Sequence, residues 1–542
     1  MKSSNAQLLH KVDNAIILTA EFDSSAIPLT YETPKSLLPV FGQPIIERQI
    51  EQLREAGIDE IIVIVGYMGE SLDYLADKYD VKLVVDPDFY ESSNVTSLFA
   101  AKDYFKNSYI LASGNYFENN IFNEYEPFSW FSSLFLDENI PYCHFVSDED
   151  DIISQLIIEG KEEFFFGGPV FLDNDFSQKF ATILEEYPTA GISSNSFWKR
   201  ALNKCFEAFN VHLCNQLDGA HDFNTLSQLR KFDKMYLDDT HCAIMEYISE
   251  VFGIPQSKIY KMKPFNTGLT NQSFIFEVNE ENYVFRVPGA GTDKLVNRSD
   301  EKRAYDLMGN TGITDEIVAI DENTGIKITK YFEGARVSEP LSNSDLKMAM
   351  RMLKELHGKE HKVTNSFDID SKIHYYHSLA DEINSIRYPD IEELKRKVAS
   401  LLELKSMLAV PEILCHGDYA YSNVLFLQDG SCKIIDWEYS GSSDPIMDVS
   451  MYCISSVFDR DRVEKAIRYY LDREPTRIEL TRLYMYLSLA GFLWCMWAEY
   501  KQGLGEEFTD YSLRTYGYMN DYYAILSEEG YFSEIMEAIY EV

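Results

Sequence analysis

Residues 415–423 and 434–438 combine carboxylates and an amide at the spacing that phosphoryl transfer uses. A His-x-Asp triplet ends at Asp418, Asn423 follows five positions later, and Asp436 comes directly after two isoleucines. Phosphoryl transfer needs one carboxylate to orient the attacking hydroxyl, and an Asp and an Asn to hold the Mg²⁺ ions that bridge the phosphates. Asp418 suits the first role, and Asn423 and Asp436 suit the second. A polar loop between two buried strands is the alternative, which the ordered pair of motifs disfavours.

A small-residue turn and a cationic strand upstream fit the same chemistry. Residues 265–274 form a turn between strand-like runs, and its backbone amides could cradle phosphates. The candidate ATP-binding residues in this turn are Gly268, Thr270 and Asn271. The predicted strand at 284–289 carries Arg286, whose planar guanidinium suits bidentate contact with phosphate oxygens. Glu301, near the start of a predicted helix, is the expected partner of Arg286, and an ordinary surface ion pair is the alternative for these two residues.

Aromatic side chains near the end of the chain indicate a cationic acceptor. A quaternary ammonium has no N–H to donate, so proteins recognise it with aromatic faces and a nearby carboxylate. Trp494 and Trp497 lie three positions apart, on one face of a predicted helix. The residues expected to contact the acceptor are Trp437, Glu438, Trp494 and Trp497. A buried amphipathic helix is the alternative for Trp494 and Trp497. The apolar run at 484–498 is too short for a membrane span.

Residues of about 250–540 resemble the choline/ethanolamine kinases, a branch of the aminoglycoside-phosphotransferase-like kinases. The resemblance rests on the segments GLTNQSF (268–274), FRVPGAGT (285–292), LVNRSDE (295–301), CHGDYAYSN (415–423) and IDWEYSGSSDPIMDVS (435–450). It implies a protein-kinase-like fold with a small β-rich lobe at about 244–332 and a larger helical lobe at about 333–542, with ATP and Mg²⁺ bound between them. It also implies that a W-x-x-W pair lines the choline pocket and that Asp444 and Asp448 stabilise the catalytic core.

The first half of the chain has a different pattern, in which predicted strands and helices alternate. A buried strand at 14–18 is followed by a proline-containing block at 28–46, a helix at 47–56 and a strand at 61–65. Residues of about 14–238 resemble the nucleotidyltransferases that make CDP-choline and nucleotide sugars. The expected fold class is therefore α/β followed by α+β: a doubly wound nucleotidyltransferase-like sheet domain, then a two-lobed kinase-like domain.

The catalytic residues that this second resemblance implies are missing. The glycine-rich turn of the family, A-A-G-x-G-S-R, is replaced at 18–26 by a segment that carries Glu21 and Asp23. A carboxylate about 4 Å from a phosphate charge costs roughly 4 kcal/mol at an effective dielectric of 20. The positions where metal carboxylates are expected hold Ala112, Gly114 and Asn224. Lys35 survives but cannot replace a metal, so the domain is expected to be inactive. An active enzyme with displaced ligands is the alternative.

Composition sets the remaining expectations. The 542 residues carry a formal net charge of -39, which disfavours nucleic acid and anionic membranes as partners and suits cationic small molecules. The 8 cysteines are scattered without metal spacing, as in a reducing cytoplasm. We expect domains at 1–240 and 241–542, joined by the polar stretch at 234–241. The oligomeric state is open, a homodimer included.

Together these patterns predict a cytoplasmic, ATP- and Mg²⁺-dependent kinase for choline or a related cationic amino alcohol, fused to an inactive cytidylyltransferase-like domain. Two alternatives remain for the first domain. It could still make CDP-choline, which would make the chain a bifunctional choline kinase and CTP:phosphocholine cytidylyltransferase. It could instead be a non-catalytic sensor of a nucleotide or phosphocholine, or an assembly module.

Overall fold

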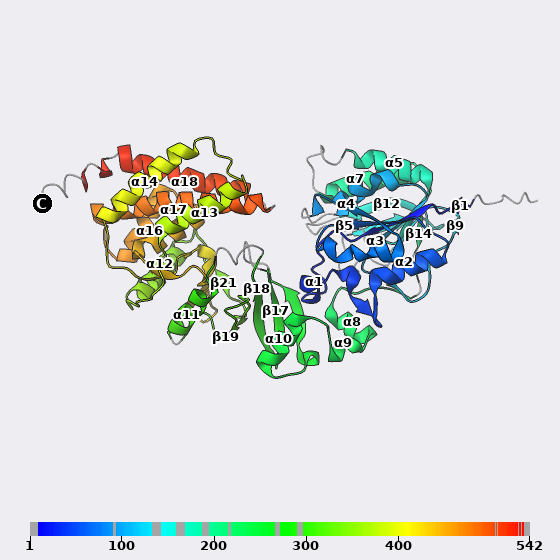
Figure 1. Cartoon of the computed structure of the whole chain (residues 1–542), viewed down its shortest axis with the longest axis horizontal. Coiled ribbons are helices and arrows are strands. Elements are labelled where there is room, and N and C mark those ends of the chain that lie inside the picture. The colour runs from blue at the N-terminus through cyan, green and yellow to red at the C-terminus, as the bar shows by residue number, and fades with distance from the viewer. Residues whose placement is uncertain are drawn as a thin grey trace, which may run out of the picture. The chain divides into compact units, whose positions relative to one another are not determined.

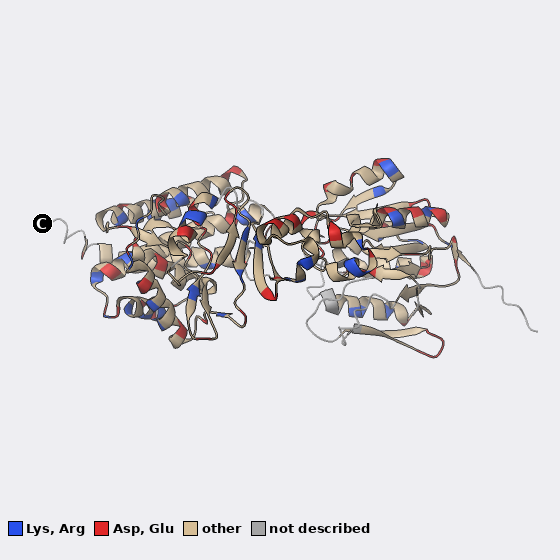
Figure 2. Ribbon diagram, turned by 90° about the horizontal axis from the view of Figure 1, so that it is seen from below, with Lys and Arg blue, Asp and Glu red and all other residues tan. Residues whose placement is uncertain are grey.

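The computed structural model describes residues 9–89, 94–132, 143–158, 168–186, 194–214, 217, 219–265, 272–289, 296–309, 311–504, 506, 508–528, 530–532 and 534–535. The chain divides into two compact units (Figure 1): Met1–Pro264 with Glu277–Asn279, and Phe265–Phe276 with Glu280–Val542. Lys and Arg positions are scattered among the Asp and Glu positions of each unit (Figure 2).

The first unit is built on a seven-stranded sheet with the strand order β14-β10-β13-β7-β2-β5-β6. Strand β2 (Asn14–Leu18) pairs in parallel with β5 (Ile61–Val65) on one side and with β7 (Ser108–Ala112) on the other. β6 (Lys82–Val85) continues the parallel part, whereas β13 (Val170–Leu172) runs antiparallel to β7. The point where the strand order reverses therefore lies between β2 and β7, and ligands of open α/β sheets bind at such a point.

Helices cover both faces of this sheet, which explains why its central strands are almost entirely buried and mostly apolar. Side chains alternate along β2, so that Ile16 and Leu18 belong to one core and Ala15 and Ile17 to another. The first core includes side chains of α4 (Asn94–Ala101), α5 (Asn174–Leu184) and α7 (Ser194–Phe206), and the second includes α2 (Ile45–Glu55) and α3 (Tyr74–Tyr79). The predicted doubly wound sheet is confirmed.

Shorter elements complete the first unit. The strands are β1 (His10–Lys11), β3 (Pro39–Val40), β4 (Gln43–Pro44), β8 (Asn115–Phe117), β9 (Tyr125–Glu126), β10 (Trp130–Ser132), β11 (Cys143–Ser147), β12 (Ile153–Ile158), β14 (His212–Cys214) and β15 (Ala220–Asp222). The helices are α1 (Leu29–Glu32), η1 (Lys35–Leu37), η2 (Gly69–Leu72), η4 (Lys102–Tyr104), α8 (Leu226–Phe232), α9 (Met235–Asp238), α10 (Ala243–Phe252) and η5 (Gln256–Lys258).

Contacts of the first unit continue past the predicted junction at 234–241. Glu32 accepts hydrogen bonds from the backbone amides of Ala243 and Ile244, at 2.8 Å each, at the start of α10. The buried guanidinium of Arg230 donates to the carbonyl oxygens of Gln256 and Ile259, at 2.7 Å each. These bonds explain why α10 and η5 count with the first unit.

The second unit begins with strands and continues with helices, as expected for a two-lobed kinase-like fold. A five-stranded sheet has the order β16-β17-β18-β20-β19. Its strands are β16 (Tyr260–Pro264), which counts with the first unit, and β17 (Gln272–Val278), β18 (Glu281–Val287), β19 (Ile317–Ile320) and β20 (Lys327–Lys330). α11 (Arg298–Met308) lies between β18 and β19 in the chain. Smaller sheets join β21 (Arg336–Val337), β23 (Val424–Phe426) and β24 (Cys432–Ile434), and β22 (Ile413–Cys415) with β25 (Gly441–Ser443).

Helices form most of the remaining chain (Figure 1). They are α12 (Asn343–His357), α13 (Ile369–Glu382), α14 (Ile391–Met407), η7 (Tyr421–Asn423), α15 (Pro445–Ser455), α16 (Arg460–Leu471), α17 (Arg477–Gly503) and α18 (Thr509–Glu528). α17 is the centre of one large core, because its middle turns are buried on every side by α13, α15 and α18. None of the helices in the described ranges has both the length and the apolar character that crossing a bilayer requires.

Candidate active site

The turn after β22 is held in place by a buried carboxylate. Asp448 of α15 accepts hydrogen bonds from the backbone amides of His416 at 2.7 Å and Gly417 at 2.9 Å. His357, at the end of α12, contacts the same carboxylate through Nε2 at 3.1 Å. Because the side chain of Asp448 is fully buried, these contacts replace the water that the charge would otherwise bind. They fix the backbone immediately before Asp418, in agreement with the structural role expected for Asp448.

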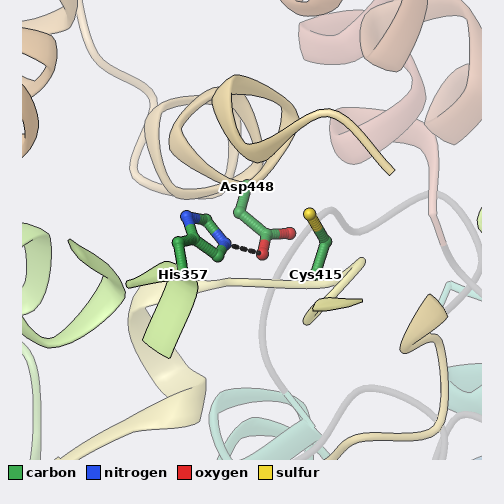
Figure 3. Close-up of side chains that lie close together, drawn as sticks. All are labelled: His357, Cys415 and Asp448. Atoms are coloured by element: carbon green, nitrogen blue, oxygen red, sulfur yellow. Dashed lines mark hydrogen bonds and ion pairs between the residues drawn. The ribbon is translucent and has the colours of Figure 1, made fainter. Parts of the chain in front are cut away.

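His357, Cys415 and Asp448 converge in the core, and one ligand atom from each lies within 4.8 Å of the others (Figure 3). Such residues can bind a metal, but a cysteine does so as a thiolate. Burial raises the pKa of Cys415 well above its usual value, and its thiol donates to the carbonyl oxygen of Ser443 at 3.5 Å. Both oxygens of Asp448 are already hydrogen-bonded. We therefore interpret this cluster as support for the backbone turn.

Asp418 and Asn423 come together after this turn. Asn423, at the end of η7, donates from Nδ2 to the side chain of Asp418 at 3.2 Å and to its carbonyl oxygen at 2.9 Å. Burial and the nearby charge of Asp436 raise the pKa of Asp418 to about 7. Asp436 follows β24 with a φ of 67°, a left-handed conformation that is strained for a residue with a side chain. Such strain clusters at functional sites.

Arg286 and Glu301 form the predicted ion pair, and the pair is buried. Arg286 Nη2 lies 2.8 Å from Glu301 Oε2, and its Nη1 lies 2.8 Å from Asp436 Oδ1 and 3.4 Å from Glu438 Oε2. Glu301 is 0% exposed. Burial acts to raise the pKa of Glu301, but the charges of Lys327 and Arg286 outweigh it and lower the pKa to about 2. The alternative of a surface ion pair does not describe these residues.

Two cations of this network were not singled out in the sequence. Lys327 on β20 lies opposite Arg286 across the sheet, and its Nζ is 3.2 Å from Glu301 Oε1 and 3.7 Å from Asp436 Oδ1. Arg298 Nη1 lies 3.2 Å from Glu438 Oε2. The strand register, which pairs residues 286 and 327, is what brings Lys327 to the site, and no local motif marks it.

Trp494 and Trp497 are both buried within a cluster of aromatic rings. Their ring centroids are 6.0 Å apart in an edge-to-face arrangement, and Trp494 meets Tyr439 at 5.7 Å. Trp497 meets Tyr511 at 6.0 Å. Burial and the charge of Asp418 both raise the pKa values of Tyr439 and Tyr511. This effect indicates that the cluster lies close to Asp418. The indole N–H of Trp497 is buried without a hydrogen-bond partner in the described part of the chain.

The other predicted site residues have different surroundings. Trp437 is fully buried, its indole N–H donates to the carbonyl oxygen of Ile434 at 3.1 Å, and its ring packs against His416 at 4.9 Å. These are the contacts of a core residue beneath the turn that carries Asp418. Glu438 is buried between Arg286 and Arg298, and burial together with Asp436 raises its pKa to about 7. Gly268, Thr270 and Asn271 lie outside the described residues.

In the first unit, Lys35 binds two carboxylates, one of which, Asp23, the sequence places near a phosphate site. Lys35 Nζ lies 2.7 Å from Asp222 Oδ1, 2.9 Å from Asp23 Oδ2, and 3.2 Å from the amide oxygen of Asn224. These two carboxylates outweigh burial and raise the pKa of Lys35 above its usual value. The positive charge of Lys35 is therefore balanced by carboxylates of its own domain.

Lys35 also fills the space beside β7. A Cβ atom added to Gly114 would lie 2.7 Å from Cε of Lys35, closer than real contacts allow. Phe22, in the segment that replaces the glycine-rich turn, stacks on Tyr31 at 5.8 Å and meets Tyr67 edge-on at 5.0 Å. Side chains of the domain itself thus occupy the carboxyl ends of β2 and β7, where a ligand of this fold would bind.

Known proteins match the two halves separately. Residues 262–498 match the family described as choline/ethanolamine kinase, and residues 28–113 match the MobA-like NTP transferase domain. The choline-phosphate cytidylyltransferase of Streptococcus pneumoniae (strain ATCC BAA-255 / R6) is 29% identical over 223 residues, which are 41% of this chain and 97% of that protein. Protein LicA of Haemophilus influenzae (strain ATCC 51907 / DSM 11121 / KW20 / Rd) is 26% identical over 258 residues, 45% of this chain and 95% of that protein.

A crystal structure of the choline kinase LicA from Streptococcus pneumoniae is 27% identical and covers 52% of this chain and 98% of its own, with a TM-score of 0.47. The chain thus carries, as the sequence motifs predicted, a choline/ethanolamine kinase domain in its C-terminal half, fused to a MobA-like NTP transferase domain at its N-terminal end.

Proposed function

We propose that the chain is an ATP-dependent kinase that phosphorylates the hydroxyl of choline or of a related cationic amino alcohol. The observation that carries the proposal is the aromatic cluster beside the half-buried Asp418, which includes Tyr439, Tyr511, Trp494 and Trp497. Aromatic faces attract a quaternary ammonium, and a carboxylate within reach of its hydroxyl supplies the base that phosphoryl transfer uses. The matched kinase family supports an alcohol acceptor.

In this proposal Asp418 accepts the proton of the acceptor hydroxyl while that oxygen attacks the γ-phosphorus of ATP. The new O–P bond forms as the bond to the β-phosphate oxygen breaks, and ADP leaves. A pKa of about 7 keeps Asp418 basic enough to take the proton near neutral pH. The hydrogen bond from Asn423 holds its carboxylate in one orientation. Arg286, positioned by Glu301, contributes positive charge to the phosphates.

The residues present also fit Mg²⁺. Mg²⁺ prefers oxygen ligands, and Asp436 offers a carboxylate. Asn423 turns its Nδ2 toward Asp418, which leaves its amide oxygen for a cation. Mg²⁺ bound there would offset the negative charge of the phosphates. Arg286 and Lys327 balance the charge of Asp436 in the structure described here, so that this carboxylate is compensated without the metal.

A substrate panel tests the proposed reaction. ADP release would be measured with choline, ethanolamine, their mono- and dimethylated intermediates, and a neutral alcohol of similar size. We expect choline to give the highest kcat/KM, because a trimethylammonium group is the least strongly hydrated of these cations and loses least on entering an aromatic site. A preference for the neutral alcohol, or no ADP release with any cationic acceptor, would contradict the proposal.

Removing either tryptophan of the W-x-x-W pair should weaken the binding of the acceptor. Trp494→Ala or Trp497→Ala should raise the KM for choline by an amount equivalent to roughly 1–2 kcal/mol, the value of a desolvated cation–π contact. The KM for ATP should change little. Trp497→Phe keeps an aromatic face and serves as the matched control, with most of the affinity retained. If both KM values rise together and the melting temperature falls, the tryptophans act only through core packing.

We propose further that the N-terminal domain no longer transfers CMP. The observation that favours this is the ion cluster of Lys35 with Asp222 and Asp23, because a neutralised lysine attracts a triphosphate only weakly. Asn224 adds an amide where a carboxylate would bind a hard cation better. A sensor or assembly role remains open to this domain.

Pyrophosphate release therefore should be undetectable when the full chain is supplied with CTP, phosphocholine and Mg²⁺. The double variant Gly114→Asp with Asn224→Asp should stay inactive, because the glycine-rich turn and its Arg are still absent. A bacterial choline-phosphate cytidylyltransferase serves as the positive control for the assay. Pyrophosphate release from the unmodified chain would establish the bifunctional alternative instead.

We also propose a cytoplasmic location. The cysteines whose side chains the structure describes are all free thiols: Cys205, Cys214, Cys242, Cys415, Cys432, Cys453 and Cys495. Unpaired thiols are typical of proteins that fold and work in a reducing compartment, which is also where ATP is abundant.

A further inference from the structure

A lysine ammonium lies among aromatic rings next to the proposed acceptor site. Lys372, in the first turn of α13, places Nζ 5.0 Å from the ring centroid of Phe367, 5.4 Å from that of Tyr439 and 5.9 Å from that of Tyr376. An ammonium within about 6 Å of an aromatic face makes a cation–π contact. We call Phe367, Tyr376 and Tyr439 the aromatic cage. Within the described residues, the Lys372 ammonium has these aromatic contacts and no hydrogen bond or ion pair.

The aromatic cage adjoins the residues assigned to the acceptor. Tyr439 meets the ring of Trp494 at 5.7 Å, so one ring belongs both to the cage and to the cluster around the tryptophans. The charge of Asp418 adds to burial in raising the pKa values of Tyr376 and Tyr439, which places both phenols near the proposed base. The cage is therefore a ready cation site within the kinase domain, at the place where a cationic acceptor would be expected.

A half-buried lysine without a paired carboxylate is costly to keep charged. Burial lowers the pKa of Lys372 to about 8, against the attraction of Asp300. Other lysines in this unit that lie over aromatic rings have a polar partner as well. Lys397, for example, lies 5.6 Å from the ring of Tyr523 and 2.9 Å from the carboxylate of Glu393. The aromatic faces are thus the main partners of the Lys372 ammonium.

We propose that Lys372 is an internal occupant of the aromatic cage, whose ammonium the cationic head group of the acceptor must displace in order to bind. The proposal rests on the proposed function for the identity of the acceptor. The free energy needed to displace Lys372 is the same for every acceptor. It therefore weakens the binding of all acceptors by the same factor and does not itself discriminate among head groups. A trimethylammonium group should still bind the aromatic cage more tightly than a primary ammonium does, because a primary ammonium resembles Lys372 itself and is strongly hydrated.

Lys372→Met tests the proposal, since it removes the charge and keeps a long, unbranched side chain. We expect the KM for choline and the KM for ethanolamine to fall by about the same factor, roughly 5- to 30-fold for one partly desolvated cation–π contact, with a smaller change in kcat. Lys372→Arg keeps a cation that stacks on aromatic faces, and its KM values should not fall. Lys397→Met is the matched control elsewhere in the domain, and its KM values should equal those of the unmodified protein.

Tetramethylammonium provides a readout that needs no catalysis. Tetramethylammonium should raise the melting temperature of the protein, and the concentration that gives half of the maximal rise is the measurement. This concentration should be lower for Lys372→Met than for the unmodified protein, by a factor similar to the fall in the KM values. A lower kcat with unchanged KM would instead assign Lys372 to the phosphates and overturn the proposal. Unchanged KM and unchanged tetramethylammonium binding would also overturn it. If the unmodified chain phosphorylates no amino alcohol, the proposed function fails, while the tetramethylammonium comparison still decides whether Lys372 occupies the cage.

Discussion

Asp418→Asn should lower the kcat for ATP-dependent phosphorylation of choline by roughly 10²- to 10⁴-fold, the contribution of a positioned general base. An asparagine has nearly the same shape and can keep the contact with Asn423, but it cannot take the proton of the hydroxyl. The KM values for ATP and choline should change much less than kcat, because the aromatic cluster and the phosphate-binding cations remain. The measurement is steady-state ADP release at saturating substrates.

Asp429→Asn is the matched control for this variant. Asp429 lies in the same lobe, in an exposed turn where it accepts hydrogen bonds from Ser431. Removing its charge leaves the site intact, so kcat should stay at the level of the unmodified protein. A kcat near that level in Asp418→Asn itself would remove Asp418 from the catalytic role.

Asp418→Asn should also increase the melting temperature, by an amount that depends on pH. The pKa of Asp418 is raised from 3.8 to about 7 on folding, so the folded protein holds the proton more tightly than the unfolded chain. The free energy of unfolding therefore falls as pH rises from about 4 to about 7. Asp418→Asn avoids this loss, and its advantage in melting temperature should be larger at pH 8 than at pH 5. The comparison is made in a chelating buffer without nucleotide. An equal difference at both pH values would contradict the assignment of a buried, titrating carboxylate.

Asp436→Asn should have the second large effect, a loss of turnover on the order of 10³-fold, because most of the catalysis of phosphoryl transfer is electrostatic. The variant loses a carboxylate ligand for Mg²⁺, so the Mg²⁺ concentration for half-maximal activity should rise as well. It also leaves Arg286 and Lys327 with one counter-charge fewer. Titration of ADP release with Mg²⁺ measures both effects.

Asp429→Asn again provides the control for Asp436→Asn, since it removes one carboxylate from the same lobe at a distance from the phosphates. Its Mg²⁺ requirement should not change. If Asp436→Asn reaches the turnover of the unmodified protein at the same Mg²⁺ concentration, the metal-binding role of Asp436 is wrong.

Local features of the site could be predicted from the sequence because they depend on near neighbours in the chain. Asn423 reaches Asp418 across five positions within one turn, so the spacing of the motif already requires the contact. The alternation of buried strands and helices likewise predicts the doubly wound sheet, since each strand buries both faces. Fifteen positions separate Arg286 and Glu301, and their pairing was expected from the order of a cationic strand and a helix that begins with acidic residues.

Other features depend on residues that are distant in sequence, and only the tertiary structure decided them. Lys327 enters the site through strand register, 41 positions from Arg286, and Asp222 neutralises Lys35 from the far end of its domain. Trp437 belongs to the sequence motif at 435–450, yet the fold buries it beneath the turn that carries Asp418.

The sequence alone therefore determined which families the two halves resemble, and it supplied the residues that we propose as the base, the oxygen ligands and the aromatic contacts of a cationic acceptor. Tertiary structure decided how their charges are compensated, and which aromatic rings surround Lys372. The physical reason is that a motif records side-chain types along one segment. The charge balance and burial of a site are sums over every segment packed around it, and those sums exist only once the chain has folded.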